Sequence, residues 1–133
     1  MKIVSIEGIG PAYAEKLQGV GVKTIEALLV KGATAKGRET LAEMTGISEK
    51  LILEWVNLAD LMRIKGVGEE YSDLLEEAGV DTVKELKRRN PENLYKAMIE
   101  VNQAKKLVRR VPNLKEVEKW VAEAGKVPPV VTY

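Results

Sequence analysis

Apolar residues recur at spacings of three and four along most of the chain, instead of alternating at a spacing of two. Spacings of three and four place side chains on one face of an α-helix, whereas half-buried strands favour a spacing of two. The pattern therefore predicts an all-α protein. In the first half of the chain, the predicted helices span residues 11–18, 23–31, 36–44 and 49–63.

The expected helix ends carry typical boundary residues. Pro11 follows a glycine turn and suits the first position of a helix, and Gly32 closes the helix over 23–31. The other start signals are Ser48 as an N-cap, residues 82–85 (Thr-Val-Lys-Glu) as a capping box, Asn90 before Pro91, and residues 113–116 (Asn-Leu-Lys-Glu) at the last helix. Pro128 and Pro129 exclude a helix at the start of the tail, which we expect to be frayed or extended along the body.

The predicted helix over 49–63 is apolar on two sides. One stripe holds Leu51, Trp55, Leu58 and Met62, and the other holds Ile52, Val56 and Ala59. Two stripes predict burial on more than one side. Trp55 and Trp120 both lie on apolar stripes, so we expect core anchors instead of platforms for nucleic-acid bases. Tyr13 and Tyr71 are expected to pack the nearby glycine turns against the core.

A repeat with a shift of 58 residues is the most informative feature of the sequence. Residues 6–28 align with residues 64–86 with nine identities in 23 positions, among them both glycines of a Gly-x-Gly turn, a Tyr and a Gly-Val-x-Thr motif. The repeat predicts a duplication with halves at 1–63 and 64–133. Each half is small for an independent domain, which favours one compact helical domain with a shared core.

The composition excludes many kinds of chemistry. The 133 residues include no His and no Cys, so the chain has no ordinary general base near neutral pH, no thiolate nucleophile, no disulfide and no thiolate zinc site. We therefore expect a protein that is not an enzyme and needs no cofactor. No window approaches the roughly 18 apolar residues of a membrane span, and the lack of Cys fits a reducing compartment. The expected location is cytoplasmic, with no membrane partner.

The charges are balanced overall, with 21 basic and 20 acidic residues, but are unevenly placed. Residues 66–81 carry six acids and no base, and residues 84–110 carry nine bases against three acids. Such runs are typical of a solvated helix face, and the basic run also fits a polyanion-binding patch.

Two Gly-x-Gly turns, residues 8–10 and 66–68, carry candidate chemistry. Glycines allow unusual dihedral angles and close approach of another backbone, while Ile9 or Val67 points inward as an anchor. The helix after each turn presents free N–H groups and the positive end of its dipole, an arrangement that suits a phosphate. The same spacing also occurs in plain tight corners.

The wider pattern resembles the tandem helix-hairpin-helix modules of DNA-handling proteins. It runs from Ile6 through Gly8, Gly10 and Leu17 to residues 21–28, is followed by residues 45–48 (Thr-Gly-Ile-Ser), and recurs from Ile64 to Leu86. Similar forms are the N-terminal domain of archaeal and eukaryotic strand-exchange recombinases and the C-terminal domain of the bacterial RNA polymerase α subunit. The whole chain also resembles a tandem helix-hairpin-helix family of unknown function with a similar Pro-Pro-Val-Val-Thr-Tyr tail. The resemblance implies duplicated helix-hairpin-helix (SAM-like) units.

The resemblance also implies four hairpin turns, here called turn 1 (residues 8–10), turn 2 (45–48), turn 3 (66–68) and turn 4 (101–104). In the resembled families, loop amides contact the DNA sugar-phosphate backbone, largely without reading sequence. Carried over, the DNA-binding residues are Gly8, Ile9, Gly10, Pro11, Ala12 and Lys16 at turn 1, Gly46, Ser48 and Lys50 at turn 2, Lys65, Gly66 and Gly68 at turn 3, and Lys105, Lys106 and Arg109 after turn 4.

The four turns are unequal. Turn 1 is followed by neutral residues, whereas Glu69 and Glu70 follow turn 3 and repel a phosphate although they suit the helix dipole. Turn 4 lacks glycine, and the basic residues after it, Lys105, Lys106, Arg109 and Arg110, are expected on the next helix. Replacing Gly8 and Gly10 by bulkier residues is expected to weaken DNA binding without unfolding the domain.

Two functions remain open from the sequence. The first is a non-enzymatic DNA-binding module that contacts the backbone through hairpin amides. The second is a protein-interaction or scaffolding domain, for which the balanced charge and the Glu69–Glu70 pair argue. In that version, the acidic segment 66–81 and the basic segment 84–110 pair between molecules and cause salt-sensitive self-association.

Overall fold

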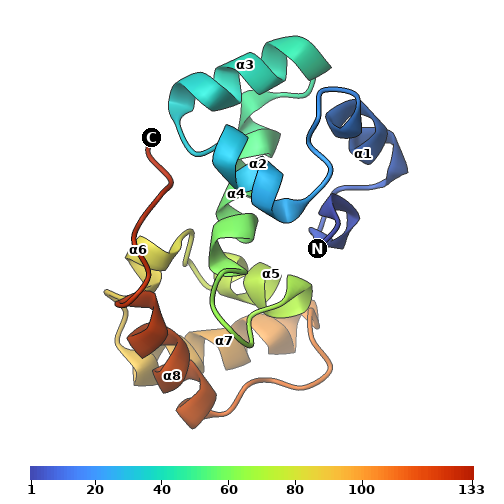
Figure 1. The fold of residues 1–133 in the computed structure, drawn as a ribbon. Coiled ribbons are helices and arrows are strands. Elements are labelled where there is room, and N and C mark those ends of the chain that lie inside the picture. Colours follow the sequence, from blue (N-terminus) through green and yellow to red (C-terminus); the bar gives the residue numbers. More distant parts are fainter. The chain divides into compact units, whose positions relative to one another are not determined.

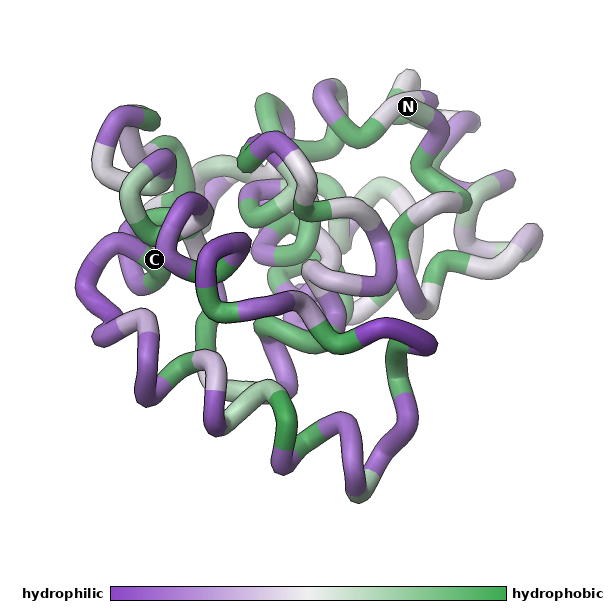
Figure 2. The backbone as a smooth tube through the Cα atoms, turned by 90° about the horizontal axis from the view of Figure 1, so that it is seen from below, coloured by the Kyte–Doolittle hydropathy of each residue, from purple (hydrophilic) through white to green (hydrophobic).

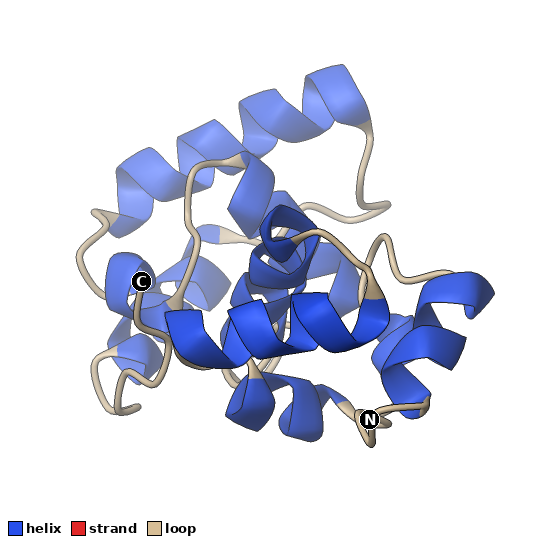
Figure 3. Ribbon diagram, turned by 90° about the horizontal axis from the view of Figure 1, so that it is seen from above, coloured by secondary structure: helices blue, strands red, loops and turns tan.

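The chain is all-helical in the computed structural model, which describes residues 1–133, and the prediction of an all-α protein is confirmed (Figures 1 and 3). A short 3-10 turn, η1 (Ile3–Ser5), precedes eight α-helices. These are α1 (Pro11–Gln18), α2 (Ile25–Lys31), α3 (Ala35–Thr45), α4 (Glu49–Leu61), α5 (Glu69–Glu77), α6 (Val83–Leu86), α7 (Pro91–Lys105) and α8 (Leu114–Ala124). No helix is both long enough and apolar enough to span a bilayer.

The contacts between residues divide the chain into two compact units. The first unit comprises Met1–Asp60 together with Val130–Tyr133, and the second comprises Leu61–Pro129. The chain therefore leaves the first unit at the end of α4 and returns to it with its last four residues. Each unit contains four of the eight helices, with α4 ending at the boundary.

Side-chain caps start several helices. Thr24, Thr34 and Asn90 each accept a hydrogen bond of 3.0 Å from the backbone N–H three residues on. Asn113 accepts one of 2.8 Å from Glu116, and Ser48 Oγ accepts one of 3.2 Å from Leu51. The predicted caps Ser48, Asn90 and Asn113 are therefore confirmed.

The predicted capping box at residues 82–85 is wrong. Thr82 has the extended backbone of an N-cap, but its side chain makes no capping hydrogen bond. The helix that it precedes, α6, is a single turn that ends at Leu86, so Glu85 lies in its last turn. The Thr82 side chain is buried, and its backbone carbonyl accepts the 2.9 Å hydrogen bond from Leu86 that closes this turn.

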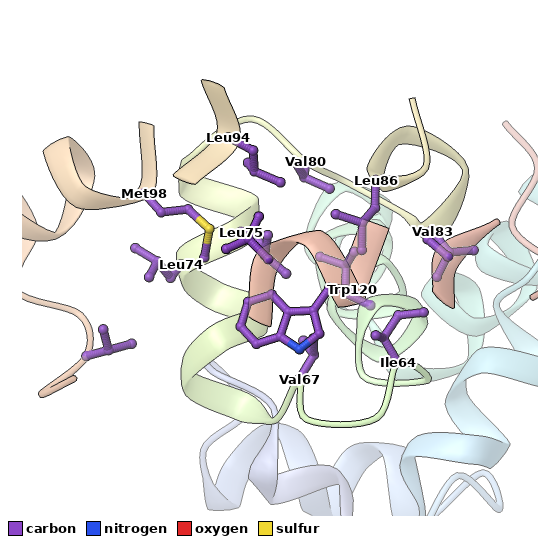
Figure 4. Close-up of a cluster of buried hydrophobic side chains, with 14 residues drawn as sticks. Ile64, Val67, Leu74, Leu75, Val80, Val83, Leu86, Leu94, Met98 and Trp120 are labelled. Atoms are coloured by element: carbon purple, nitrogen blue, oxygen red, sulfur yellow. The ribbon is translucent and has the colours of Figure 1, made fainter. Parts of the chain in front are cut away.

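Each unit has its own set of buried apolar side chains. Hydrophobic and hydrophilic positions are interspersed along the backbone (Figure 2). In the first unit the buried residues include Ile6, Leu17, Leu28, Ile52 and Trp55. In the second unit, Trp120 lies beside Val67 and among aliphatic side chains from α5, α6 and α7 (Figure 4). The predicted roles of Trp55 and Trp120 as core anchors are confirmed.

The tail after α8 is extended, which was one of the two conformations expected from the sequence. Residues 128–133 contain no helix, and the Thr132 N–H donates a 2.8 Å hydrogen bond to the carbonyl of Ala33 in the first unit. The tail is therefore docked at its end instead of frayed.

Glu116 gives the second unit a stability that depends on pH. Its two carboxylate oxygens accept hydrogen bonds of 2.8 and 2.9 Å from Arg110, and the Asn113 N–H donates a third of 3.1 Å. Arg110 first, and the Asn113 N–H second, lower the pKa of Glu116 to about 2. Because the folded pKa lies below the unfolded value, this stabilisation is complete above pH of about 4.5 and is lost as the pH falls towards 2.

We expect Glu116→Gln to lower the urea midpoint of unfolding at pH 7. The further fall of this midpoint between pH 5 and pH 2.5 should be smaller than in the parent chain. Both midpoints are measured by circular dichroism. Glu118→Gln, at an exposed position on the same helix, is the control and should follow the parent chain. An equal acid-induced loss in the parent chain and in Glu116→Gln would contradict the assignment.

Candidate nucleic-acid interface

Turn 1 joins η1 to α1 through two glycines with different requirements. Gly8 has a φ of +93°, which side chains rarely adopt, and a Cβ on it would lie 3.3 Å from Nε1 of Trp55. Gly10 has extended backbone angles (φ −85°, ψ −179°) and serves as the N-cap of α1. A Cβ on Gly10 would meet nothing within 4 Å. The fold therefore requires glycine at position 8 and does not require it at position 10.

Turn 3 repeats this geometry in the second unit. Gly66 also has a φ of +93°, and a Cβ on it would lie 3.1 Å from Nε1 of Trp120. Gly68 is the N-cap of α5 with open space around it. The residues between the glycines, Ile9 and Val67, are both buried as the predicted anchors.

A tyrosine packs on the tryptophan in each unit. The ring centroids of Tyr13 and Trp55 are 5.1 Å apart, and those of Tyr71 and Trp120 are 5.2 Å apart. The prediction that Tyr13 and Tyr71 pack their turns against the core is confirmed. Each turn is thus held by an aromatic pair, which fixes the first turn of the following helix in place.

The two glycines of turn 1 should respond differently to the same substitution. We expect Gly8→Ser to lower the free energy of unfolding by about 1–2 kcal/mol, because a side chain at positive φ is strained and crowds Trp55. We expect Gly10→Ser to stay within about 0.5 kcal/mol of the parent chain, because serine fits the space and is a good N-cap. Urea denaturation measures the free energy of unfolding of both variants. Equal losses would contradict the inference that only position 8 requires glycine. The expectation that replacing both glycines does not unfold the domain stays a prediction, and the geometry adds that the cost in stability comes mainly from position 8.

The start of α1 is open to an anion. Gly10, Pro11 and Ala12 are exposed, no side chain caps the helix, and no acid lies in its first turn. The first N–H groups of a helix have no partner within it, and the helix dipole adds a partial positive charge at this end. The backbone N–H groups of Ala12 and Tyr13 belong to this set. This end of α1 therefore offers donors and positive potential without a competing carboxylate.

An open cavity of about 530 Å³ in the first unit lies between α1 and Thr45, the first residue of turn 2. Its lining comes from both ends of α1 and from the end of α3, and comprises Ala12, Glu15, Lys16, Gly19, Val20, Met44 and Thr45. Lys16 supplies a cation here and Glu15 an opposing charge. Thr45 was missing from the predicted site, although its place just before the helix-ending Gly46 was a usable signal.

Turn 2 connects α3 to α4 through one glycine. Gly46 ends α3 in a left-handed conformation (φ +75°), Ile47 is buried, and Ser48 caps α4. Gly46, Ser48 and Lys50 are exposed, so these three predicted residues are accessible beside the cavity-lining Thr45.

Turn 3 faces charged residues of both signs. An open cavity of about 430 Å³ is lined by Gly66, Gly68, Glu69, Glu70, Tyr71, Arg109 and Arg110. Arg110 is paired with Glu116 on α8, and the Tyr71 hydroxyl donates a 2.8 Å hydrogen bond to the carbonyl of Arg110. Lys65 is exposed before the turn. The structure thus brings Arg109 to Gly66 and Gly68, but next to two carboxylates in the first turn of α5.

The predicted turn 4 is wrong. Residues 101–104 lie within α7, which ends at Lys105, and Lys106 follows in a left-handed conformation (φ +51°). Arg109 and Arg110 lie in the non-helical segment before α8, not on a helix. The Asn102 side chain causes this turn, because it accepts a 2.9 Å hydrogen bond from the Val108 N–H and donates one of 3.1 Å to the Val108 carbonyl.

Lys105 is already engaged inside the second unit. It forms an ion pair with Glu77 on α5, and Glu77 raises the pKa of Lys105. The acidic segment 66–81 and the basic segment 84–110 therefore meet within one molecule at this point. This contact removes one of the charges that the self-association hypothesis assigned to pairing between molecules.

Comparison with known proteins gives a family. A model of the family described as "Domain of unknown function (DUF4332)" matches residues 7–127. No solved structure matches the chain.

Proposed function

We propose that this chain, which belongs to the DUF4332 family, is a non-enzymatic module that binds the sugar-phosphate backbone of DNA without reading its sequence. The proposed contact surface is the exposed start of α1, together with Lys16 and the neighbouring turn 2. The helix-hairpin-helix resemblance of residues 6–28 and 45–48 supports DNA as the source of the phosphate.

Gly10 is the observation that carries the proposal. Its backbone angles suit any residue, and a Cβ on it would meet no atom of the chain. A serine, aspartate or asparagine would cap α1 better than glycine does. Packing and capping therefore leave the glycine unexplained, whereas a phosphate that must approach the N–H groups of α1 closely accounts for it.

The surroundings of Gly10 suit a phosphate. Lys16 and Thr45 line the cavity that begins at Ala12, and Lys50 is exposed in the first turn of α4. Lys16 and Lys50 supply two positive charges, Glu15 offsets part of that charge in the cavity, and the Thr45 hydroxyl already donates a 2.6 Å hydrogen bond to the carbonyl of Leu41. Backbone donors and flexible cations hold a phosphate in many sequence contexts, which agrees with binding that does not depend on base identity.

The second unit supports the binding less directly. The matching turn 3 carries Glu69 and Glu70, which repel a phosphate, while Arg109 offsets part of that charge. Lys84, Lys87 and Arg88 are exposed around α6 and supply a nonspecific attraction for a polyanion. We therefore assign the principal contact to turn 1.

Fluorescence anisotropy with a labelled 30-base-pair duplex tests the proposal. We expect a Kd on the order of 10⁻⁴ to 10⁻⁶ M near physiological salt. If three or four phosphates are neutralised, raising the salt from 50 to 200 mM should weaken binding by a factor of about 40 to 150. Two duplexes of unrelated sequence should bind equally. Absence of binding at 50 mM salt would overturn the proposal.

A matched pair of variants locates the contact. Gly10→Val fills the open space above α1 and should weaken binding, whereas Gly68→Val makes the same change at the acid-flanked turn 3 and should weaken it less. Equal circular dichroism spectra would show that both variants are folded. A folded Gly10→Val variant with unchanged affinity would remove turn 1 from the interface.

A further inference from the structure

The last four residues of the chain occupy a built site on the first unit. The preceding residues, through Pro129, belong to the second unit. The Thr132 N–H donates to the Ala33 carbonyl at 2.8 Å, and Nη2 of Arg38 donates to the Thr132 carbonyl at 2.6 Å. The N–H and the carbonyl of Thr132 are thus both hydrogen-bonded to other residues of the first unit.

Arg38 is the centre of this site. Its side chain is only 5% exposed, and Nη1 donates to the carbonyls of Gly32 at 2.9 Å and Ala33 at 3.1 Å. Three backbone carbonyls therefore solvate a buried guanidinium, and one of them comes from Thr132. Because a buried cation needs such partners, removal of Thr132 leaves Nη2 without one of its acceptors.

The aromatic residue after Thr132 is recognised as well. The Tyr133 hydroxyl donates a 3.2 Å hydrogen bond to Oδ1 of the buried Asn57, and the Arg38 guanidinium lies 5.8 Å from the centre of the Tyr133 ring. The site thus contacts the backbone of Thr132 and the phenol of Tyr133. This combination is the chemistry of extended-peptide recognition, in which main-chain hydrogen bonds supply affinity and side chains supply selectivity.

The docked segment is held by few groups. Val130 and Tyr133 are 37% and 70% exposed and Val131 is half-buried, so the segment buries limited apolar surface. Pro128 and Pro129 before it form a stiff, extended spacer without backbone donors. A short segment that is held mainly by hydrogen bonds can open without unfolding either unit.

We propose that the Arg38 site is a receptor for an extended Val-Thr-Tyr segment and that residues 130–133 of a second copy of this chain can occupy it in place of the chain's own. The occupant follows from the structure, because a second copy presents the same backbone groups and the same phenol to Ala33, Arg38 and Asn57. Such an exchange of identical segments pairs two copies without any new interface. It competes with the chain's own segment, which acts at an effective concentration in the millimolar range.

Disabling the chain's own segment makes the receptor accessible to a probe. In the full-length variant Thr132→Pro, the donor to Ala33 is lost and the segment should leave the site. A fluorescent synthetic peptide of residues 125–133 should then bind this variant at least about tenfold more tightly than it binds the parent chain, whose site is filled. A control peptide with the Thr132→Pro change should not bind either protein.

A mixture of two full-length variants tests the pairing itself. Arg38→Met keeps the segment and loses the receptor, whereas Thr132→Pro keeps the receptor and loses the segment. Each alone should sediment as a monomer at several hundred micromolar, and the mixture should contain a species of twice the mass. If Arg38→Met does not fold, the peptide experiment decides. Equal peptide affinity for Thr132→Pro and the parent chain, or no binding to either, would overturn the proposal.

Discussion

Replacing Trp120 by alanine is expected to lower the free energy of unfolding by about 3–5 kcal/mol. Trp120 is 3% exposed and lies in the core of the second unit, where its ring packs on Tyr71 and beside Val67 (Figure 4). Truncation removes the transfer free energy of a large aromatic side chain and leaves a cavity. It also removes the support of turn 3, because Nε1 of Trp120 lies beside Gly66.

Urea denaturation followed by circular dichroism measures this loss. Lys119→Ala, at an exposed position on the same helix, should change the free energy of unfolding by less than about 0.5 kcal/mol. Trp55 is then the single tryptophan of the variant, so its emission reports on the first unit alone. A loss below about 1 kcal/mol would show that Trp120 does not anchor this core.

Local signals made most helices predictable from the sequence. The predicted bounds 11–18 match α1, and Asn90 and Asn113 begin α7 and α8 as expected. These ends depend on a proline, a cap and a glycine within a few residues of each other, so neighbours in sequence suffice to place them. The aromatic anchors were predictable for the same reason, since Trp55 and Trp120 lie on periodic apolar stripes.

The failures occur where a particular hydrogen bond between a side chain and the backbone decides the conformation. After α7, the Asn102 side chain forms two hydrogen bonds with the backbone of Val108. The helix-hairpin-helix resemblance, which implied a turn at residues 101–104, does not indicate these bonds. Arg38 was not singled out at all, because one of the three carbonyls that bind its buried guanidinium lies 94 residues away. A sequence shows that an arginine is present, but not which distant backbone folds onto it.

The candidate site was predictable in place and not in detail. The Gly-x-Gly pattern led to turn 1, yet it treated Gly8 and Gly10 as equivalent. Only the φ of +93° at Gly8 and its distance to Trp55 separate a glycine that the fold needs from one that it does not. In the same way, the cavity that joins Lys16 to Thr45 depends on the packing of α1 beside the end of α3.

Exchanging the residues after turns 1 and 3 should exchange their affinities for DNA. Pro11 and Ala12 align with Glu69 and Glu70, so the double variant Pro11→Glu/Ala12→Glu gives turn 1 the acids of turn 3. We expect it to weaken duplex binding by at least about tenfold. Each carboxylate near a phosphate costs about 1 kcal/mol in water and more at a protein surface, and 1.4 kcal/mol is a factor of ten.

The introduced carboxylates should weaken DNA binding and stabilise the helix, so a loss of affinity cannot be attributed to unfolding. Acids in the first turn stabilise a helix by about 0.3–1 kcal/mol through its dipole, so the variant should lose DNA without losing its fold. The reciprocal variant, Glu69→Pro/Glu70→Ala, leaves turn 1 intact, frees turn 3 beside Arg109, and should bind the duplex more tightly than the parent chain. Anisotropy at 50 mM salt measures all three proteins. If the first variant keeps the parent affinity, turn 1 makes no contact with the duplex and the assignment to α1 is wrong.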